Sequence, residues 1–292
     1  MFCLLRHTHF LHRSQLVCRF SEGSTKIRKQ VNPVTIHAAV DLLFSPNKAS
    51  TNISNILIDV RSPSEYKSGH IPGSHNLPLF SDDERAVVGT TYKQVGSDAA
   101  VRRGLQLVSP KLNTIVEEVD RMKTRYGNNP KVFVHCWRGG MRSSSVAWLL
   151  TVAGYECYVI EGGYKAFRNW ALNSFQPHLF VVVLSGGTGS GKTAVLQALR
   201  DKHGQQVIDL ETLANHRGSA FGHLNMGNQP TQEMFENTLA IAWYQLQSDR
   251  AVWMENESKM IGRLSLPPSL YDMILNPRAV MELNMPRNLY VP

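Results

Sequence analysis

Hydrophobic and polar positions form blocks along this chain, so that short apolar runs are separated by polar or glycine-rich turns. Runs rich in Val, Ile and Leu occur at residues 56–60, 131–135, 155–160 and 179–184. Such runs are typical of strands buried on both faces of a parallel sheet. Helix-like segments follow two of these runs, at residues 143–150 and 194–200. The pattern therefore predicts an α/β protein with parallel sheets.

The turn after residues 131–135 reads Cys-Trp-Arg-Gly-Gly-Met-Arg over residues 136–142. A strand that ends in cysteine, turns through two glycines and enters a helix aims several backbone N–H groups at one point beside the sulfur, which makes an anion cradle. The same field lowers the pKa of the thiol and favours the nucleophilic thiolate. A buried structural thiol is the alternative for Cys136, but it leaves both arginines unexplained. We therefore predict Cys136, Arg138 and Arg142 as catalytic residues.

A second glycine-rich turn follows the apolar run at residues 179–184 and satisfies the pattern GxxxxGK[ST]. Successive N–H groups of such a loop cradle phosphates, its lysine neutralises charge, and its Thr hydroxyl can hold Mg²⁺. A connector that matches by chance is the alternative, but the strand before the loop and the helix after it favour a P-loop. The predicted phosphate- or diphosphate-binding residues are Gly186, Gly187, Thr188, Gly189, Ser190, Gly191, Lys192 and Thr193.

A P-loop works with an acidic residue on a neighbouring strand, which helps to position a metal ion or a water molecule. The candidates are Asp209, Glu211, Glu255 and Glu257. Asp209 is the first choice, ahead of Glu255 and Glu257. A solvated carboxylate or one that caps a helix is the alternative for each of them. No resident metal site or tightly bound cofactor is predicted, although Mg²⁺ can accompany the phosphates.

Length and charge limit the possible classes of protein. A chain of 292 residues with 42% hydrophobic and 18% charged residues can bury substantial cores, and its length suggests two domains. The net charge is +8, but residues 1–30 carry six basic residues and one acidic residue, so they account for +5 of it. Bulk charge is therefore a weak argument for nucleic-acid binding, which must rest on local clusters such as Lys93, Arg102 and Arg103, or on the family.

Residues 1–30 are basic, contain serine and interleave apolar residues with the charges. This composition resembles an organellar transit peptide for a mitochondrion or a chloroplast, and a disordered tail of a cytoplasmic protein is the alternative. No stretch of the chain has the roughly 20 uninterrupted apolar residues that a membrane span requires, so a soluble protein is expected. The four cysteines form no CxxC pair, and a disulfide framework is therefore not indicated.

Several separated motifs resemble the rhodanese (sulfurtransferase) domain over about residues 35–172. They are Asp59-Val-Arg61, Glu65, Gly69-His-Ile-Pro-Gly73, the cysteine loop, and Glu161-Gly-Gly-Tyr-Lys-Ala-Phe167. In ordinary rhodaneses four residues separate the cysteine from the arginine, whereas five separate Cys136 from Arg142, as in the related cell-cycle phosphatases. This spacing implies a cradle for a tetrahedral phosphorus-type oxyanion or a larger group.

The order of the two domains resembles the bacterial tRNA 2-selenouridine synthases over about residues 35–290. The P-loop part of the resemblance rests on residues 209–211, 216–222, 235–237 and 255–258. The resemblance implies a tRNA-modifying transferase that replaces the sulfur of wobble 2-thiouridine by selenium from selenophosphate, after S-geranylation with geranyl diphosphate. Cys136 would then attack or carry the chalcogen, while the P-loop would bind the diphosphate of the prenyl donor.

The expected organisation is a tail at residues 1–30, a rhodanese-like domain at 35–172 and a P-loop NTPase-like α/β domain at 178–292. Family members continue for several more helical segments, so the second domain is expected to be C-terminally truncated. Two other functions stay open. One is a generic sulfurtransferase or phosphatase that acts without tRNA, and the other is a non-catalytic nucleotide-binding protein. The oligomeric state is not predicted.

Overall fold

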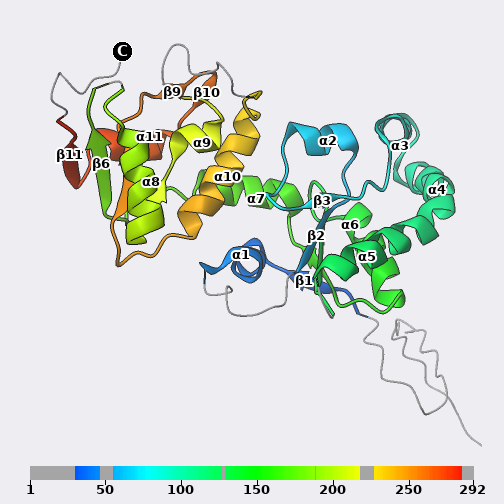
Figure 1. The fold of residues 1–292 in the computed structure, drawn as a ribbon. Coiled ribbons are helices and arrows are strands. Elements are labelled where there is room, and N and C mark those ends of the chain that lie inside the picture. The colour runs from blue at the N-terminus through cyan, green and yellow to red at the C-terminus, as the bar shows by residue number, and fades with distance from the viewer. Residues whose placement is uncertain (1–29, 47–54, 127–128, 188, 218–226, 285–292) are drawn as a thin grey trace, which may run out of the picture.

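The structure, a computed structural model, describes residues 30–46, 55–126, 129–187, 189–217 and 227–284 (Figure 1). Four parts of the sequence predictions lie outside these residues. They are most of the tail at 1–30, Thr188, most of the segment 216–222, and the end of the chain after residue 284. The described residues form two α/β domains joined by a short connector.

The first domain is built on a five-stranded sheet in the order β1-β5-β4-β2-β3, in which every neighbouring pair is parallel. The strands are β1 (Asn32–Val34), β2 (Ile56–Asp59), β3 (His75–Asn76), β4 (Val132–His135) and β5 (Cys157–Ile160). The apolar runs predicted as strands at 56–60, 131–135 and 155–160 are confirmed. The sheet also takes in β1, which precedes residue 35.

Helices cover both faces of this sheet, as parallel strands require. They are α1 (Ile36–Phe44), α2 (Pro63–Ser68), α3 (Asp82–Gln94), α4 (Ser97–Val108), the 3-10 turn Ser109–Lys111, α5 (Leu112–Tyr126), α6 (Met141–Val152) and α7 (Gly163–Leu172). Alternate strand residues point to opposite faces. Ile56 and Ile58 therefore pack in one core with α5 and α6, whereas Leu57 packs in the other with α1 and α7.

The second domain has a four-stranded parallel sheet in the order β11-β6-β8-β7. Its strands are β6 (Val181–Ser185), β7 (Gln206–Ile208), β8 (Val252–Glu255) and β11 (Ala279–Glu282), and a separate antiparallel pair is formed by β9 (Met260–Ile261) and β10 (Leu264–Ser265). Its helices are α8 (Lys192–His203), α9 (Leu210–Ala214), α10 (Gln232–Tyr244) and α11 (Pro268–Leu275). The predicted α/β fold class holds for both domains.

The two domains share one hydrophobic core. This core contains Phe133 and Phe167 of the first domain together with Phe235 and Trp243 of the second. Helix α10 packs beside α7 at the junction (Figure 1). Phe175, in the connector, is 1% exposed and its ring lies 6.0 Å from that of Trp243. The connector is therefore part of the packed junction.

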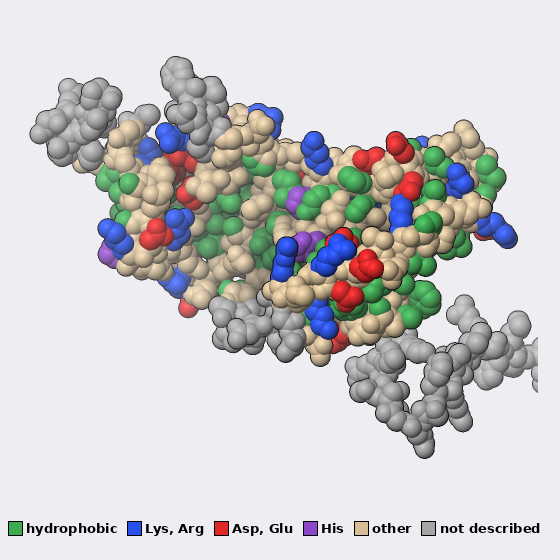
Figure 2. Space-filling model, turned by 45° about the vertical axis from the view of Figure 1, so that its right-hand side comes forward, with side chains coloured by type: hydrophobic (Ala, Val, Ile, Leu, Met, Phe, Trp, Pro, Cys, Tyr) green, Lys and Arg blue, Asp and Glu red, His purple; other side chains and the backbone are tan. Residues whose placement is uncertain are grey.

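The surface gives mixed support for a basic interaction site. Lys93 lies on α3 and Arg102 and Arg103 on α4, and all three side chains are exposed. On the face drawn in Figure 2, however, basic and acidic side chains lie among one another. Among the described residues, no helix is both long enough and apolar enough to cross a membrane.

The shared core gives a prediction about stability. Phe167 is 0% exposed, whereas Leu172, on the same helix α7, is 46% exposed. Phe167→Ala should lower the free energy of unfolding by about 3–5 kcal/mol, because it leaves a cavity in the shared core. Leu172→Ala should change it by about 0.5 kcal/mol or less. Urea unfolding followed by circular dichroism measures both. Equal destabilisation by the two variants would contradict the assignment of Phe167 to the core.

Candidate active sites at the carboxyl ends of the two sheets

The cysteine loop begins where strand β4 ends and closes where helix α6 begins. It is docked on the first turn of α7, because the backbone N–H of Tyr164 donates to the Cys136 carbonyl at 2.8 Å and that of Lys165 to the Trp137 carbonyl at 2.9 Å. The approach leaves no room for side chains. Gly163 has φ +56°, and a Cβ there would collide with the Cys136 carbonyl oxygen. Gly163 of the Glu161–Phe167 motif therefore permits the close approach of the loop to α7.

Cys136 lies 4% exposed at the base of this loop, and Ser143 Oγ donates to its Sγ at 3.3 Å. Burial opposes ionisation of the thiol, but the Ser143 hydroxyl and the backbone N–H groups of Arg138 and Ser143 outweigh it. The positive charge of Arg142 acts in the same direction. The pKa of the Cys136 thiol therefore lies below its usual value, which favours the thiolate as the sequence predicts.

Ser143 is a functional residue that the sequence analysis did not single out. It is the first of three consecutive serines at the start of α6, and it is fully buried while the next two are exposed. Its hydroxyl also contacts the Gly140 carbonyl at 3.0 Å. The only signal in the sequence is its position directly after Arg142.

The two predicted arginines are arranged differently. Arg142 Nη1 lies 2.9 Å from Glu65 Oε2. Burial raises the pKa of Glu65, but the hydrogen bond and the charge of Arg142 act against it, and the pKa lies below its usual value. Glu65 belongs to a rhodanese-like motif, so the structure brings that motif to the cysteine loop. Arg138 is exposed and gives its backbone N–H to the sulfur. Their part in catalysis stays a prediction.

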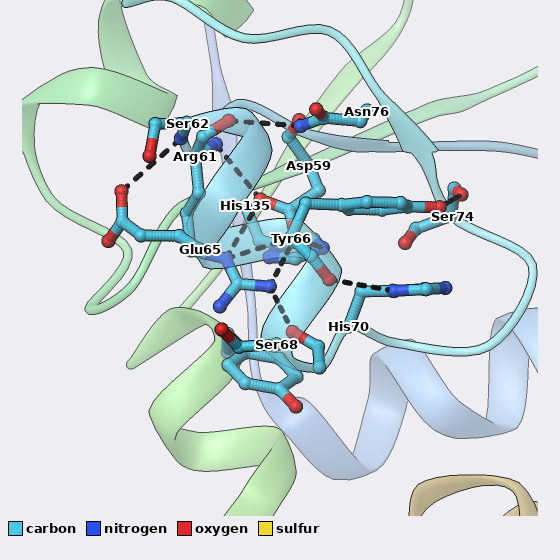
Figure 3. A network of polar contacts seen from close by, with 12 residues as sticks. Asp59, Arg61, Ser62, Glu65, Tyr66, Ser68, His70, Ser74, Asn76 and His135 are labelled. Atoms are coloured by element: carbon cyan, nitrogen blue, oxygen red, sulfur yellow. Dashed lines mark hydrogen bonds and ion pairs between the residues drawn. The ribbon is translucent and has the colours of Figure 1, made fainter. Parts of the chain in front are cut away.

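A buried ionic network lies next to the loop (Figure 3). Arg61, 1% exposed, lies 2.6 Å from Asp59 Oδ2 and donates to the Gly69 carbonyl at 2.7 Å. Its guanidinium carbon lies 3.9 Å from the centre of the Tyr164 ring. His135 Nε2 lies 3.9 Å from Asp59 Oδ2, and burial lowers the pKa of His135. The Asp59–Arg61 pair gives the loop a rigid, charged support, because Arg61 is held by Asp59 and by the Gly69 carbonyl. Neither ring nitrogen of His135 makes a hydrogen bond among the described residues.

The P-loop connects β6 to α8, as predicted. Lys192 Nζ donates to the carbonyl oxygens of Gly186 at 2.9 Å and Gly187 at 3.2 Å. Gly191, directly before α8, has φ +83°, a conformation that favours glycine. A bound phosphate would exchange these carbonyl contacts of Lys192 for stronger charge-assisted ones.

The carboxylate bonded to the P-loop is not Asp209, which was the first choice from the sequence. Asp209 caps α9, where it accepts from the Thr212 backbone N–H at 2.9 Å and from the Thr212 hydroxyl at 2.8 Å. Glu255 instead accepts from the Thr193 hydroxyl at 2.8 Å. In the structure Glu255 is therefore the carboxylate bonded to Thr193, whereas capping of the short helix α9 occupies Asp209.

Three carboxylates converge at Thr193, since ligand atoms of Glu211, Glu255 and Glu257 lie within 4.8 Å of one another. Burial and the neighbouring carboxylates raise the pKa of Glu255, and they raise that of Glu257 to about 7. Oxygen ligands of this kind suit Mg²⁺, and a cation would relieve their mutual repulsion. These residues therefore fit the Mg²⁺ ion that accompanies phosphates in P-loop proteins.

Comparisons with known proteins fit both sites. The sequence matches two family models, a rhodanese-like domain over residues 45–169 and the tRNA 2-selenouridine synthase AAA domain over residues 179–288. It is 40% identical over 228 residues to a tRNA 2-selenouridine synthase of Nitrosomonas europaea, which covers 75% of this chain and 57% of that protein. The chain is a relative of the tRNA 2-selenouridine synthases.

A second tRNA 2-selenouridine synthase, from Shewanella denitrificans, is 43% identical over 222 residues, which covers 74% of this chain and 58% of that protein. Thus the chain spans less than three fifths of the length of these two relatives. A crystal structure of the N-terminal domain of a Clostridium difficile 630 protein is 36% identical, with a TM-score of 0.42. It covers 49% of this chain and 100% of that one.

The environment of Cys136 gives a prediction about its reactivity. Ser143→Ala removes a hydroxyl donor from the thiolate, so the midpoint of the pH profile for alkylation by iodoacetamide should rise by about one unit. Peptide mass spectrometry measures the rate at Cys136. The control is Ser145→Ala, which removes a hydroxyl that donates to the Arg142 carbonyl on the same helix.

Cys157 provides an internal reference in the same experiment. Burial raises the pKa of this thiol to about 11, so it should not react near neutral pH. An unchanged alkylation midpoint in Ser143→Ala would show that the hydroxyl does not stabilise the thiolate.

The carboxylate cluster gives a prediction about cation binding. Because its pKa is about 7, Glu257 holds a proton below that pH, and a cation must displace it. The affinity for Mn²⁺ should therefore fall as the pH drops below 7, and Glu257→Gln should weaken binding and flatten this dependence. Isothermal titration calorimetry with Mn²⁺ measures both. Asp201→Asn, on the exposed side of α8, is the control. A Glu257→Gln chain with the same affinity and pH profile as the unaltered chain would refute the site.

Proposed function

We propose that this chain is a tRNA-modifying transferase that replaces the sulfur of a wobble 2-thiouridine by selenium. The observation that carries the proposal is the combination, in one chain, of a thiolate loop with a P-loop domain that matches the AAA domain of tRNA 2-selenouridine synthases. The relatives named tRNA 2-selenouridine synthase align across both domains. A transferase that uses both sites would explain why the two domains share one core.

The P-loop is the proposed site for geranyl diphosphate. In this step the sulfur of the 2-thiouridine attacks C1 of the geranyl group, the C–O bond to the diphosphate breaks, the diphosphate leaves, and N3 of the base loses its proton to water. Lys192 and the loop N–H groups would stabilise the negative charge that develops on the leaving group. Mg²⁺, held at Thr193 and Glu255, would add further charge stabilisation. The hydrogen bond between Thr193 and Glu255, within the carboxylate cluster, supports this arrangement.

The cysteine loop is the proposed site for selenophosphate. Its anion would be held by loop N–H groups and by Arg138 and Arg142. The selenium would attack C2 of the geranylated base, the C–S bond would break and geranyl thiolate would leave. The Cys136 thiolate would then attack phosphorus, break the P–Se bond and release 2-selenouridine, and water would hydrolyse the phosphocysteine to phosphate. The ion pair between Arg142 and Glu65 supports this role, because it fixes the guanidinium beside the loop.

A sulfurtransferase or phosphatase that acts without tRNA is the second candidate. The spacing of five residues between Cys136 and Arg142 favours it, since this loop resembles that of cell-cycle phosphatases. Such an enzyme would need only the first domain. The P-loop domain would then have no part in turnover, and loss of Lys192 would leave the activity unchanged.

The proposal predicts separate losses in two variants. 2-Thiouridine tRNA is incubated with geranyl diphosphate, selenophosphate and the chain, and its nucleosides are identified by mass spectrometry. Lys192→Ala should lower geranylation by about 100-fold or more, because it removes a charge that stabilises the leaving group. Cys136→Ala should abolish selenation but leave geranylation intact.

Lys202→Ala is the matched control for Lys192, because Lys202 lies on α8 and is exposed. It should modify tRNA like the unaltered chain. If the folded chain modified no nucleoside but turned over thiosulfate or an aryl phosphate, the second candidate would replace the proposal.

A further inference from the structure

One tyrosine at the domain junction is bonded to both domains. The hydroxyl of Tyr164, on α7, donates to Glu233 Oε1 at 2.5 Å and accepts from Asn237 Nδ2 at 2.8 Å. Glu233 and Asn237 both lie on α10 of the second domain. Tyr164 is 0% exposed, so water cannot substitute freely for these two partners. The position of the tyrosine side chain is therefore set by the second domain.

The same residue holds the cysteine loop. Its backbone N–H donates to the Cys136 carbonyl, and its ring lies over the Arg61 guanidinium and 5.8 Å from the Trp137 ring. Any displacement of the Tyr164 side chain would therefore move the first turn of α7. Because the loop is docked on that turn, the backbone N–H groups that face the sulfur would move with it.

Asn237, a partner of Tyr164 on α10, has little freedom to follow a shift of the tyrosine. Asn237 is 0% exposed, and its Oδ1 accepts from Arg168 Nη1 at 2.6 Å. Its Nδ2 donates to the His70 carbonyl at 2.8 Å as well as to Tyr164. With the amide oxygen and both N–H groups engaged, the side chain has one orientation that satisfies its partners. Asn237 thus joins two segments of the first domain, at His70 and Tyr164.

We infer that Tyr164, Glu233 and Asn237 are positioning residues for Cys136, so that the P-loop domain completes the cysteine site of the first domain. The inference rests on Cys136 being the reactive thiol of the proposed function. Helix α10 would then both pack the two domains together and fix the position of the cysteine loop. If the interface served only to hold the domains together, the reactivity of Cys136 would not depend on which interdomain hydrogen bond is removed.

The chain offers a matched pair of tyrosines to test this. Tyr244 lies at the other end of α10, and its hydroxyl donates to Asp41 of the first domain. Tyr164→Phe and Tyr244→Phe each remove one tyrosine–carboxylate hydrogen bond between the domains. Only Tyr164 is in contact with the cysteine loop. The readout is the pH profile of Cys136 alkylation by iodoacetamide in the full chain, resolved by peptide mass spectrometry.

Tyr164→Phe should move the alkylation midpoint to higher pH and slow alkylation at neutral pH by about threefold or more, the change that accompanies half a pKa unit. Tyr244→Phe should reproduce the profile of the unaltered chain. Glu233→Ala, at a side chain that is 35% exposed, provides a second variant that is expected to fold and should shift the profile in the same direction. Glu233→Gln keeps an acceptor for Tyr164 and should restore the unaltered profile.

Equal profiles for Tyr164→Phe, Glu233→Ala and Tyr244→Phe would overturn the inference, whether all three shift or none does. Alkylation needs no tRNA, selenophosphate or geranyl diphosphate. A chain that modifies no tRNA but shows the predicted shifts would therefore refute the proposed function and leave the inference standing. Modified tRNA together with equal alkylation profiles would support the proposed function and refute the inference.

Discussion

The docking of the cysteine loop on the first turn of α7 is the contact on which the rest of the site depends. Two backbone hydrogen bonds, from Tyr164 and Lys165, hold the loop, and Gly163 allows the two backbones to approach. The loop N–H groups can favour the thiolate only in this geometry. Since α7 also packs against α10, the same helix joins the sulfur site to the second domain.

The two sites tune ionisation in opposite directions. At the first, hydrogen bonds and the Arg142 charge overcome burial and favour the anion of Cys136. At the second, burial and like charges raise the pKa values of Glu255 and Glu257, so these carboxylates are best ionised beside a cation. A thiolate nucleophile and a cation-assisted diphosphate site are what the two steps of the proposed reaction require.

Local pattern predicted much of this structure, because buried parallel strands and phosphate loops depend on residues close together in sequence. The strand at residues 131–135, the cysteine loop and the start of α8 belong to this group. The choice between Asp209 and Glu255 could not be made in the same way. It depends on which side chain the register of parallel β6, β7 and β8 brings to Thr193.

The contacts of Asn237 were also beyond sequence reasoning, although residues 235–237 were recognised as part of a family motif. Asn237 meets His70 and Tyr164 across more than seventy positions of chain. Only the packing of α10 on α7 brings these residues together. Ser143 was missed for the opposite reason, since three adjacent serines look alike until the helix buries one of them.

The central claim is that the two domains carry out successive steps on one tRNA. The most direct test separates the steps in time. 2-Thiouridine tRNA is first treated with the Cys136→Ala chain and geranyl diphosphate, then purified and given to the Lys192→Ala chain with selenophosphate. The account predicts 2-selenouridine from the geranylated tRNA and none from untreated 2-thiouridine tRNA. Equal selenation of both tRNAs, or of neither, would contradict it.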